Sequence, residues 1–384
     1  MRIGGRRSAT RTVFTLVPVV TVVLVAALLM ASCTSTTNPT AAPPTTAGPA
    51  TTQGVTTTTA AQTSTTAAQA NFGGYPAGST CADCHNDSTV LASKQSQMKQ
   101  RSVHGTGEAF EEGERTACAG CHGSEGTKAR INAGLLPHDK SISAIENVSP
   151  MGCRTCHDIH KTYTGADFSL TGGEKPVKME YTAGTFDKGA GNLCANCHQI
   201  RNPAPEVKNG QIEITTVRYG PHYGIQAPML LGEGGLGGVA GGAGPHYENV
   251  EESCVSCHMG EEFNHTMEVG VLDRSVTPPQ LARCSGCHKG LEALDRNNVQ
   301  TDVQAMLDLA KAGLIKAGIM NAEDELAIPG TYPEALANAF WNYKVAFWDG
   351  SKGVHNSAYT EALLQYVIDT VKSTSASSTS TTGR

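Results

Sequence analysis

The pentapeptide Cys-x-x-Cys-His occurs six times in this chain of 384 residues and accounts for twelve of its 13 cysteines. Two thiols three residues apart lie on one helical turn, where they can add to the vinyl groups of a porphyrin, and the adjacent imidazole can bind the iron. The pattern therefore predicts six covalently attached c-type haems. Numbered as the first to the sixth site, the copies are Cys81, Cys84 and His85; Cys118, Cys121 and His122; Cys153, Cys156 and His157; Cys194, Cys197 and His198; Cys254, Cys257 and His258; Cys284, Cys287 and His288.

Cys-x-x-Cys pairs also occur in zinc ribbons and in redox-active dithiols. Neither class requires a histidine directly after the second cysteine in every copy, so haem attachment is the favoured interpretation. Composition supports it, because only 5% of the residues are aromatic and a chain of this length normally buries many large apolar side chains. Porphyrins would fill the interior that this composition leaves open.

Each predicted iron needs a second axial ligand, and seven of the 13 histidines lie outside the pentapeptides. Six of them would give every iron two imidazoles, which favours low-potential sites with closed coordination over ligation by methionine. His138, in Leu-Pro-His-Asp, is the predicted spare. His160 is too close to His157 to reach the same iron, so we expect it to bind at a neighbouring haem. The predicted distal ligands are His104, His160, His222, His246, His265 and His355.

The N-terminus has the three parts of an export signal: four arginines without acids in residues 1–12, an apolar run over 13–31, and a small residue before Cys33. Met30-Ala31-Ser32-Cys33 resembles a bacterial lipobox, which predicts a lipoprotein-type signal peptide over 1–32 and lipidation of Cys33. An uncleaved anchor helix and ordinary cleavage are the alternatives. All three place the body of the protein outside the cytoplasm, where c-type haem is attached.

Three further segments follow from composition. Residues 33–71 are rich in Thr, Ala and Pro and should form a disordered linker. Residues 72–372 contain all six pentapeptides and form the predicted hexahaem domain. Residues 373–384, rich in Ser and Thr, are predicted to be a disordered tail.

The expected fold is mainly α and irregular, with loops and short helices around six haems, longer C-terminal helices and little or no sheet. Apolar residues from Val299 to Leu314 recur at helical spacing. Thr331-x-x-Glu334 with Pro333 predicts a helix start, and Gly350 its end. Asn356 or Ser357 could cap a last helix. The glycine-rich stretch 232–244 should be a loop against a porphyrin or the surface.

Over residues 80–372 the chain resembles bacterial multihaem cytochromes c, the broad class with pentahaem nitrite reductases and hydroxylamine-oxidoreductase-like proteins. The resemblance rests on the six pentapeptides, on Tyr219-Gly220-Pro221-His222-Tyr223, and on Asp349-Gly350-Ser351 with Gly353-Val354-His355-Asn356. It implies stacked haems, most of them held by two histidines. The Cys-x-x-Cys-Lys site of many nitrite reductases is missing, which argues against nitrite reduction.

Electron transfer between membrane enzymes and an extracellular acceptor or partner cytochrome is the favoured function. One alternative is a reductase or oxidase of small nitrogen or sulfur compounds, with one five-coordinate haem and polar groups from Arg218 and Tyr219. Another is a subunit of an extracellular cytochrome filament, that is, self-assembly. A nucleic-acid partner is not expected, because the net charge is −6 and phosphate binding requires a basic face.

Overall fold

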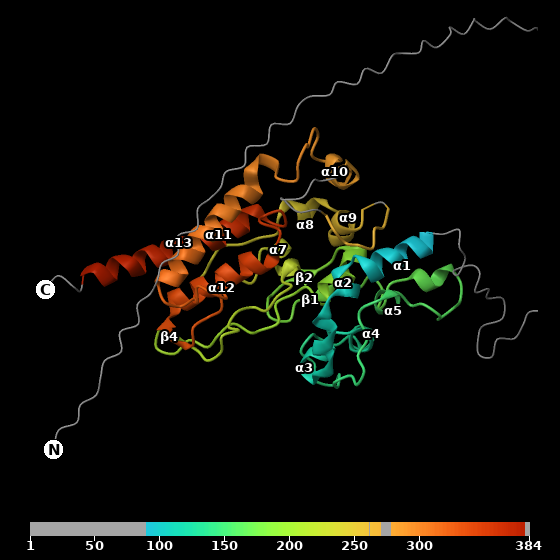
Figure 1. Cartoon of the computed structure of the whole chain (residues 1–384), viewed down its shortest axis with the longest axis horizontal. Helices are drawn as coiled ribbons and strands as arrows, with labels where there is room; N and C mark the ends of the chain where they lie inside the picture. Colours follow the sequence, from blue (N-terminus) through green and yellow to red (C-terminus); the bar gives the residue numbers. More distant parts are fainter. Residues whose placement is uncertain (1–89, 261, 270–277, 381–384) are drawn as a thin grey trace, which may run out of the picture. The chain divides into compact units, whose positions relative to one another are not determined.

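The computed structural model describes residues 90–260, 262–269 and 278–380. The first attachment site, the predicted signal peptide and the predicted linker lie outside these residues. The described fold is mainly helical and irregular, with two small antiparallel sheets (Figure 1), so the predicted fold class is confirmed.

Short helices dominate the chain up to the sixth site, and long helices follow it. The α-helices are α1 (Val90–Gln100), α2 (Val103–Thr106), α3 (Thr116–Ala119), α4 (Ser124–Ala133), α5 (Cys153–Cys156), α6 (Asn192–Ala195), α7 (Gln226–Leu231), α8 (Pro245–Asn249), α9 (Cys254–His258), α10 (Pro278–Ser285), α11 (Val299–Lys316), α12 (Glu334–Asp349) and α13 (Ser357–Ser380). The 3-10 helices are η2 (Glu108–Glu114), η3 (Gly165–Phe168), η4 (Gly189–Gly191) and η5 (Arg296–Asn298). The strands are β1 (Val177–Lys178), β2 (Thr185–Phe186), β3 (Gln211–Ile214) and β4 (Gly330–Pro333).

The three long helices α11, α12 and α13 lie against one another (Figure 1) and form what we name the C-terminal helical core. Its interior is aliphatic and aromatic, with Leu314, Phe340 and Val367 fully buried. Both predicted boundaries are present: Gly350 ends α12 in the left-handed conformation, and Asn356 accepts a hydrogen bond from the Tyr359 amide at the start of α13. Helix α13 runs on to Ser380, past residue 372, where the sequence predicts a disordered tail.

Strand β3 pairs with β4 and adds two isoleucines, Ile212 and Ile214, to this core. The pairing overturns one local prediction. Thr331 lies in β4 opposite Glu213, so it cannot act as the predicted helix cap. Helix α12 instead begins directly after Pro333, and no side chain caps it. Sheet pairing with a distant strand has replaced the capping box in this segment.

The glycine-rich loop 232–244 packs on the C-terminal helical core. The amide of Gly235 donates to the Tyr359 hydroxyl over 2.7 Å, and Leu236 and Asn342 exchange two hydrogen bonds. At Gly235 a Cβ atom would lie 2.4 Å from a Leu363 methyl group, so any larger residue here would require the Leu363 side chain to move. The predicted loop is present, and the surface it covers is formed by protein helices.

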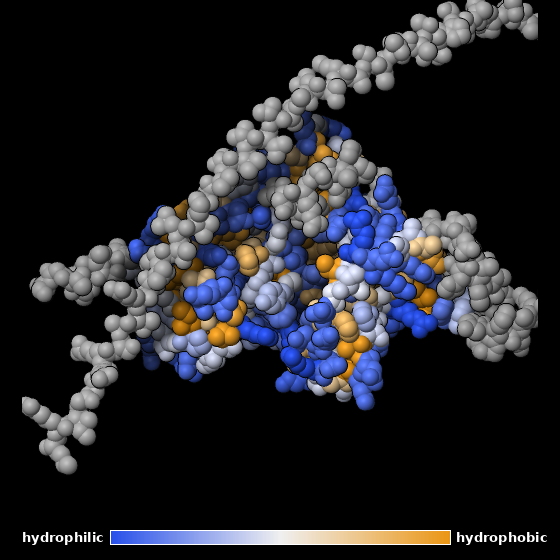
Figure 2. Space-filling model, in the orientation of Figure 1, coloured by the Kyte–Doolittle hydropathy of each residue, from blue (hydrophilic) through white to orange (hydrophobic). Residues whose placement is uncertain are grey.

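No helix in the described part of the chain is both long enough and apolar enough to cross a membrane. On the face drawn in Figure 2, hydrophilic residues cover most of the described surface and hydrophobic residues show in small, separate patches.

Candidate haem-binding sites

Each described pentapeptide forms a single helical turn. In the second, third, fourth and sixth sites the amide of the histidine donates to the carbonyl of the first cysteine over 2.9 Å, and the fifth site forms helix α9. This turn brings both thiols and the imidazole close together, as thioether attachment and iron binding require. The ten described cysteines are free thiols, none of them in a disulfide.

Every described pentapeptide histidine faces one histidine from another part of the chain. The ring centres of His122 and His222 are 6.3 Å apart, and those of His157 and His265 are 6.2 Å apart. The corresponding separations are 6.0 Å for His104 and His198, 6.4 Å for His258 and His355, and 5.9 Å for His246 and His288.

These separations suit an iron held between two imidazoles. Two metal–nitrogen bonds of about 2 Å, plus ~1 Å from each nitrogen to its ring centre, place the ring centres roughly 6 Å apart. The histidines occur as pairs: among the described residues, no group of three or more His, Cys, Asp or Glu side chains could hold a metal ion. The residues present therefore fit haem at the second to sixth sites.

Hydrogen bonds from Nδ1 orient most of these rings. Nδ1 of His122, His157 and His258 donates to the backbone carbonyls of Ala109, Phe168 and Met267 over 2.8, 2.7 and 2.9 Å. Among the distal histidines, His222, His265 and His246 donate to the carbonyls of Tyr223, Phe263 and Val354. A proton on Nδ1 leaves Nε2 as the lone-pair nitrogen, which is the form that binds metal.

Burial keeps two of the distal histidines neutral. Burial, together with the nearby His198 and His258, lowers the pKa of His104 to about 4. Burial also lowers the pKa of His222 to about 4, although its hydrogen bond to Tyr223 acts in the opposite direction. Because the neutral imidazole is the ligand, both side chains are ready to bind iron well below neutral pH.

His222 is held in an uncommon backbone conformation. Its φ of 76° lies in the left-handed region, between Pro221 and Tyr223. Non-glycine residues in this region store strain that the surrounding structure must hold, and such strain clusters at functional sites. The sequence Gly-Pro-His-Tyr thus aims the ring at the second site by fixing the backbone.

Contacts between cysteines of different pentapeptides show which sites are neighbours. The thiol of Cys121, in the second site, lies close to that of Cys197 in the fourth. Cys194, the other thiol of the fourth site, lies close to Cys254 of the fifth. Cys156 of the third site lies close to both thiols of the fourth. Cys257 of the fifth site lies close to Cys284 of the sixth.

Two arginines, one of them buried, fasten neighbouring sites to each other. Arg130 is 1% exposed; its Nε donates to the carbonyl of Gly120 in the second pentapeptide over 2.6 Å, and its Nη2 to that of Asn196 in the fourth over 2.8 Å. Arg283, just before the sixth pentapeptide, donates to the carbonyl of Cys257 over 3.0 Å. Sequence reasoning missed both arginines, because nothing in their local sequence shows that they bond to the backbone of another pentapeptide.

Two further histidines, the predicted spare His138 and the predicted distal ligand His160, face no pentapeptide histidine among the described residues. His138 hydrogen-bonds to Glu180 over 3.2 Å and accepts from Arg201 over 3.4 Å, beside the second site. His160 has a φ of 63°, stacks on Tyr163 and hydrogen-bonds to Arg154 over 2.8 Å. The first-site histidine, His85, lies outside the described residues.

The two polar residues suggested for an open haem differ in burial. The Tyr219 ring packs 5.9 Å from both Phe340 and Trp341, and its hydroxyl donates to the carbonyl of Ala337. Arg218 is exposed. A role for either residue beside a haem stays a prediction.

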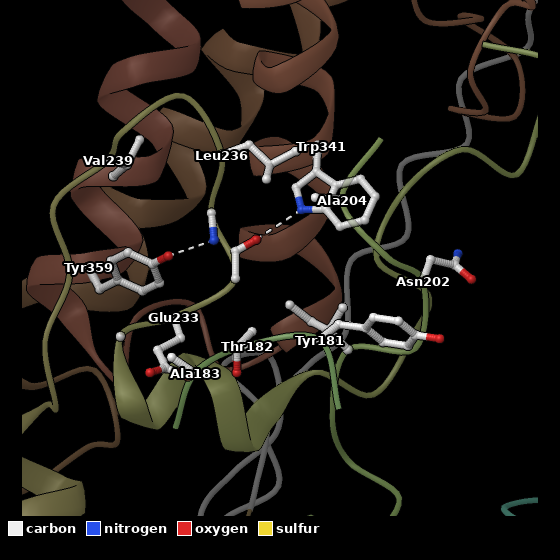
Figure 3. A pocket seen from close by; sticks show the side chains of 14 residues that line it. Tyr181, Thr182, Ala183, Asn202, Ala204, Glu233, Leu236, Val239, Trp341 and Tyr359 are labelled. Atoms are coloured by element: carbon white, nitrogen blue, oxygen red, sulfur yellow. Dashed lines mark hydrogen bonds between the residues drawn. The ribbon is translucent and has the colours of Figure 1, made fainter. Parts of the chain in front are cut away.

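A cavity of about 300 Å³ lies between the glycine-rich loop and α12 (Figure 3). Two of its aromatic residues use their polar atoms to hold the loop: Trp341 Nε1 donates to Gly234 over 2.9 Å, and the Tyr359 hydroxyl accepts from Gly235. Tyr181, Ile200 and Leu236 supply much of the remaining wall. The cavity thus belongs to the packing between loop and helices.

Comparison with known proteins adds one similarity. No protein-family model matches this chain, and no curated protein does. Among solved structures, the outer cell wall cytochrome OcwA is similar, with 20% identical residues and a TM-score of 0.45. The match covers 72% of this chain and 49% of that one, so this chain spans about half the length of that cytochrome.

Proposed function

We propose that this chain is an exported electron-transfer protein, a c-type cytochrome with six covalent haems, each held between two imidazoles. The five facing histidine pairs carry the proposal, because their ring centres lie 5.9–6.4 Å apart. Haem bound there would supply a one-electron Fe(III)/Fe(II) couple at each site.

The histidine pairs support electron transfer rather than catalysis. With an imidazole on each face, the iron position has no vacancy for a substrate. The hydrogen bonds from Nδ1 hold most rings in place, which limits reorganisation when the charge of the site changes. His85 and His160 complete the set in this proposal, because His160 is the remaining predicted distal ligand and His138 is held by Glu180.

The cysteine contacts support a branched order of sites. The fourth site neighbours the second, third and fifth, and the fifth neighbours the sixth. Electrons entering at the second, third or sixth site would therefore meet at the fourth. Such an arrangement suits a protein that serves more than one redox partner.

The proposed location is the outer face of a membrane. Residues 1–32 would direct export, the lipidated Cys33 would anchor the chain, and residues 33–71 would act as a tether for the haem domain. Membrane enzymes are the proposed donors, and an extracellular acceptor or another cytochrome the proposed acceptor.

A reductase of small nitrogen or sulfur compounds would need one open iron. Each described pentapeptide histidine already faces a second imidazole, so the open position would have to be at the first site. Spin state separates the two functions, because an iron with two imidazoles is low-spin and a five-coordinate iron is high-spin.

The test is the electron paramagnetic resonance spectrum of the oxidised protein, with the haem content measured by mass. We expect six haems and only low-spin signals. Replacing His222→Ala should convert one haem in six to high spin, whereas His138→Ala, the matched control, should leave every haem low-spin. A high-spin haem in the unaltered protein would favour the reductase, and a mass equal to the bare polypeptide would refute the proposal.

A further inference from the structure

The carboxylate of Asp349 is buried against one of the paired histidines. Its side chain is fully buried at the end of α12, and Oδ1 accepts a hydrogen bond of 2.6 Å from Nδ1 of His355. The other oxygen, Oδ2, accepts from the amide and from the hydroxyl of Ser351. The Ser351 hydroxyl oxygen accepts in turn from the His355 amide over 3.1 Å. Both oxygens are thus held by the short loop between α12 and α13.

The carboxylate of Asp349 differs from the hydrogen-bond acceptors of the other paired histidines. Seven further paired histidines in the described residues donate Nδ1 to an uncharged oxygen: six to backbone carbonyls and His198 to the Gln226 side-chain amide, over 2.7 Å. His355 is the member of the described pairs that donates to a carboxylate. A hydrogen bond to a charged acceptor is about twice as strong as one between neutral groups.

The negative charge of Asp349 would affect an iron bound at Nε2 of His355 in two ways. A carboxylate draws the Nδ1 proton toward itself, which raises the electron density on the imidazole and makes it a stronger ligand. The negative charge, buried away from solvent, also favours the more positive oxidation state of a nearby iron. Both effects act in the same direction and lower the reduction potential.

We propose that Asp349 is a positioning residue that sets the fifth site, held by His258 and His355, at the lowest potential of the described sites. The proposal rests on the proposed electron-transfer function and adds a role for one residue within it. Asp349 touches neither the iron position nor the attachment cysteines; it acts through His355.

Because of its position among the sites, a low potential at the fifth site would affect electron transfer to and from the sixth. Cys254 lies close to the fourth site and Cys257 lies close to the sixth, so the fifth site connects the sixth to the other described sites. The neighbouring residue, Val354, accepts the hydrogen bond of His246, the distal histidine of the sixth site, over 2.5 Å. One loop therefore holds ligands of both sites. A low potential at this connection would make it an uphill step between the sixth site and the branch point.

The test is a spectroelectrochemical titration of the haem-loaded full chain. In Asp349→Asn, one of six components should become easier to reduce, with its reduced-to-oxidised ratio at a fixed applied potential rising about tenfold. The low-spin signal of the same haem should change its g-values. Asp369→Asn removes the same charge at an exposed position of α13 and should alter neither readout.

A second variant protects the test against misfolding. Ser351→Ala removes one donor from Oδ2, so more of the carboxylate charge acts on His355, and the same component should move the opposite way. Unchanged titrations in both variants, with six low-spin haems retained, would refute the role of Asp349. Absence of haem or of low-spin iron in the unaltered protein would instead refute the proposed function.

Discussion

The two parts of the described chain fill their interiors differently. In residues 91–176 the buried hydrophobic side chains are Met98 and Ala119. Helix α12 alone buries Leu336, Phe340 and Trp341. The first part also buries the guanidinium of Arg130, a charged group that is rarely fully buried unless it is paired. Its cysteines and most of its histidines are half-buried. The comparison teaches that the C-terminal helical core can be stabilised by its own side chains, whereas the region of the second and third sites needs the porphyrins.

Producing the protein without haem attachment is the strongest test of this difference between the two parts. We expect the region 103–176 to lose its fold, because too little apolar surface is buried there to offset the chain entropy. Helices α11 to α13 should persist. Hydrogen exchange followed by mass spectrometry would show protected amides in 299–373 and rapid exchange in 103–176. Equal protection in both parts would contradict the expectation.

Phe340→Ala should destabilise the C-terminal helical core while the haem sites remain intact. Phe340 is 0% exposed, and truncation of a buried aromatic residue costs about 3–5 kcal/mol of unfolding free energy. The loss should appear in denaturation followed by far-ultraviolet circular dichroism, while the folded protein keeps its low-spin haem spectrum. Leu309→Ala, at a position 63% exposed on α11, is the control and should change neither. A high-spin signal in Phe340→Ala would show that the helical core supports the haem ligands directly.

Lys344 provides a pH test confined to the helical core. Burial lowers its pKa to about 8, although Glu325 and Asp324 act against the shift. Between pH 8 and 10.5 the unfolded chain keeps a proton that the folded chain has lost, so the unfolding free energy rises with pH in this window. Lys344→Met removes the buried charge but also the hydrogen bond to the Glu325 carbonyl. The net effect should be an unfolding free energy about 1–2 kcal/mol higher than that of the unaltered protein at pH 7. Denaturation at pH 7, 9 and 10 should show this advantage shrinking; a constant difference would contradict the assignment.

Gly313→Ala should give the smallest effect. A Cβ atom there would lie 2.3 Å from a methyl group of Val371, so α11 and α13 could not keep their present spacing. Overpacking costs roughly 1–3 kcal/mol, and the better helix propensity of alanine returns up to about 1 kcal/mol. We expect a net loss of about 1 kcal/mol in chemical denaturation. In Gly134→Ala nothing lies near the added atom, but φ is 66°. This second variant therefore measures the cost of backbone strain, for comparison with the cost of overpacking at Gly313.

Local patterns in the sequence were sufficient to predict much of the fold. Helical spacing identified α11, α12 and α13, and glycine marked the end of α12. The six attachment sites correctly predicted short helices and loops before the long C-terminal helices. The predicted start of α12 failed at Thr331 because pairing with β3, more than a hundred residues earlier, overrode the local capping signal.

Which histidines face each other could not be predicted from spacing. His265 follows the fifth pentapeptide closely, yet it faces His157 of the third. His104 precedes the second pentapeptide and faces His198 of the fourth. Partners are chosen by how distant segments fold together, which local sequence does not encode. The role proposed for Asp349 was equally invisible, because an aspartate before glycine at a helix end is also an ordinary surface residue.

The histidine pairs also impose an order on assembly outside the cytoplasm, because four of the five described pairs join residues roughly a hundred positions apart. Ordered by the later member of each described pair, the fourth site has both histidines at His198, followed by the second, third and sixth sites. The fifth has to wait for His355. The branch point can thus be assembled before the later segments of the chain have been exported, and a protein truncated before His355 would lack a ligand at the site that links the sixth to the other described sites.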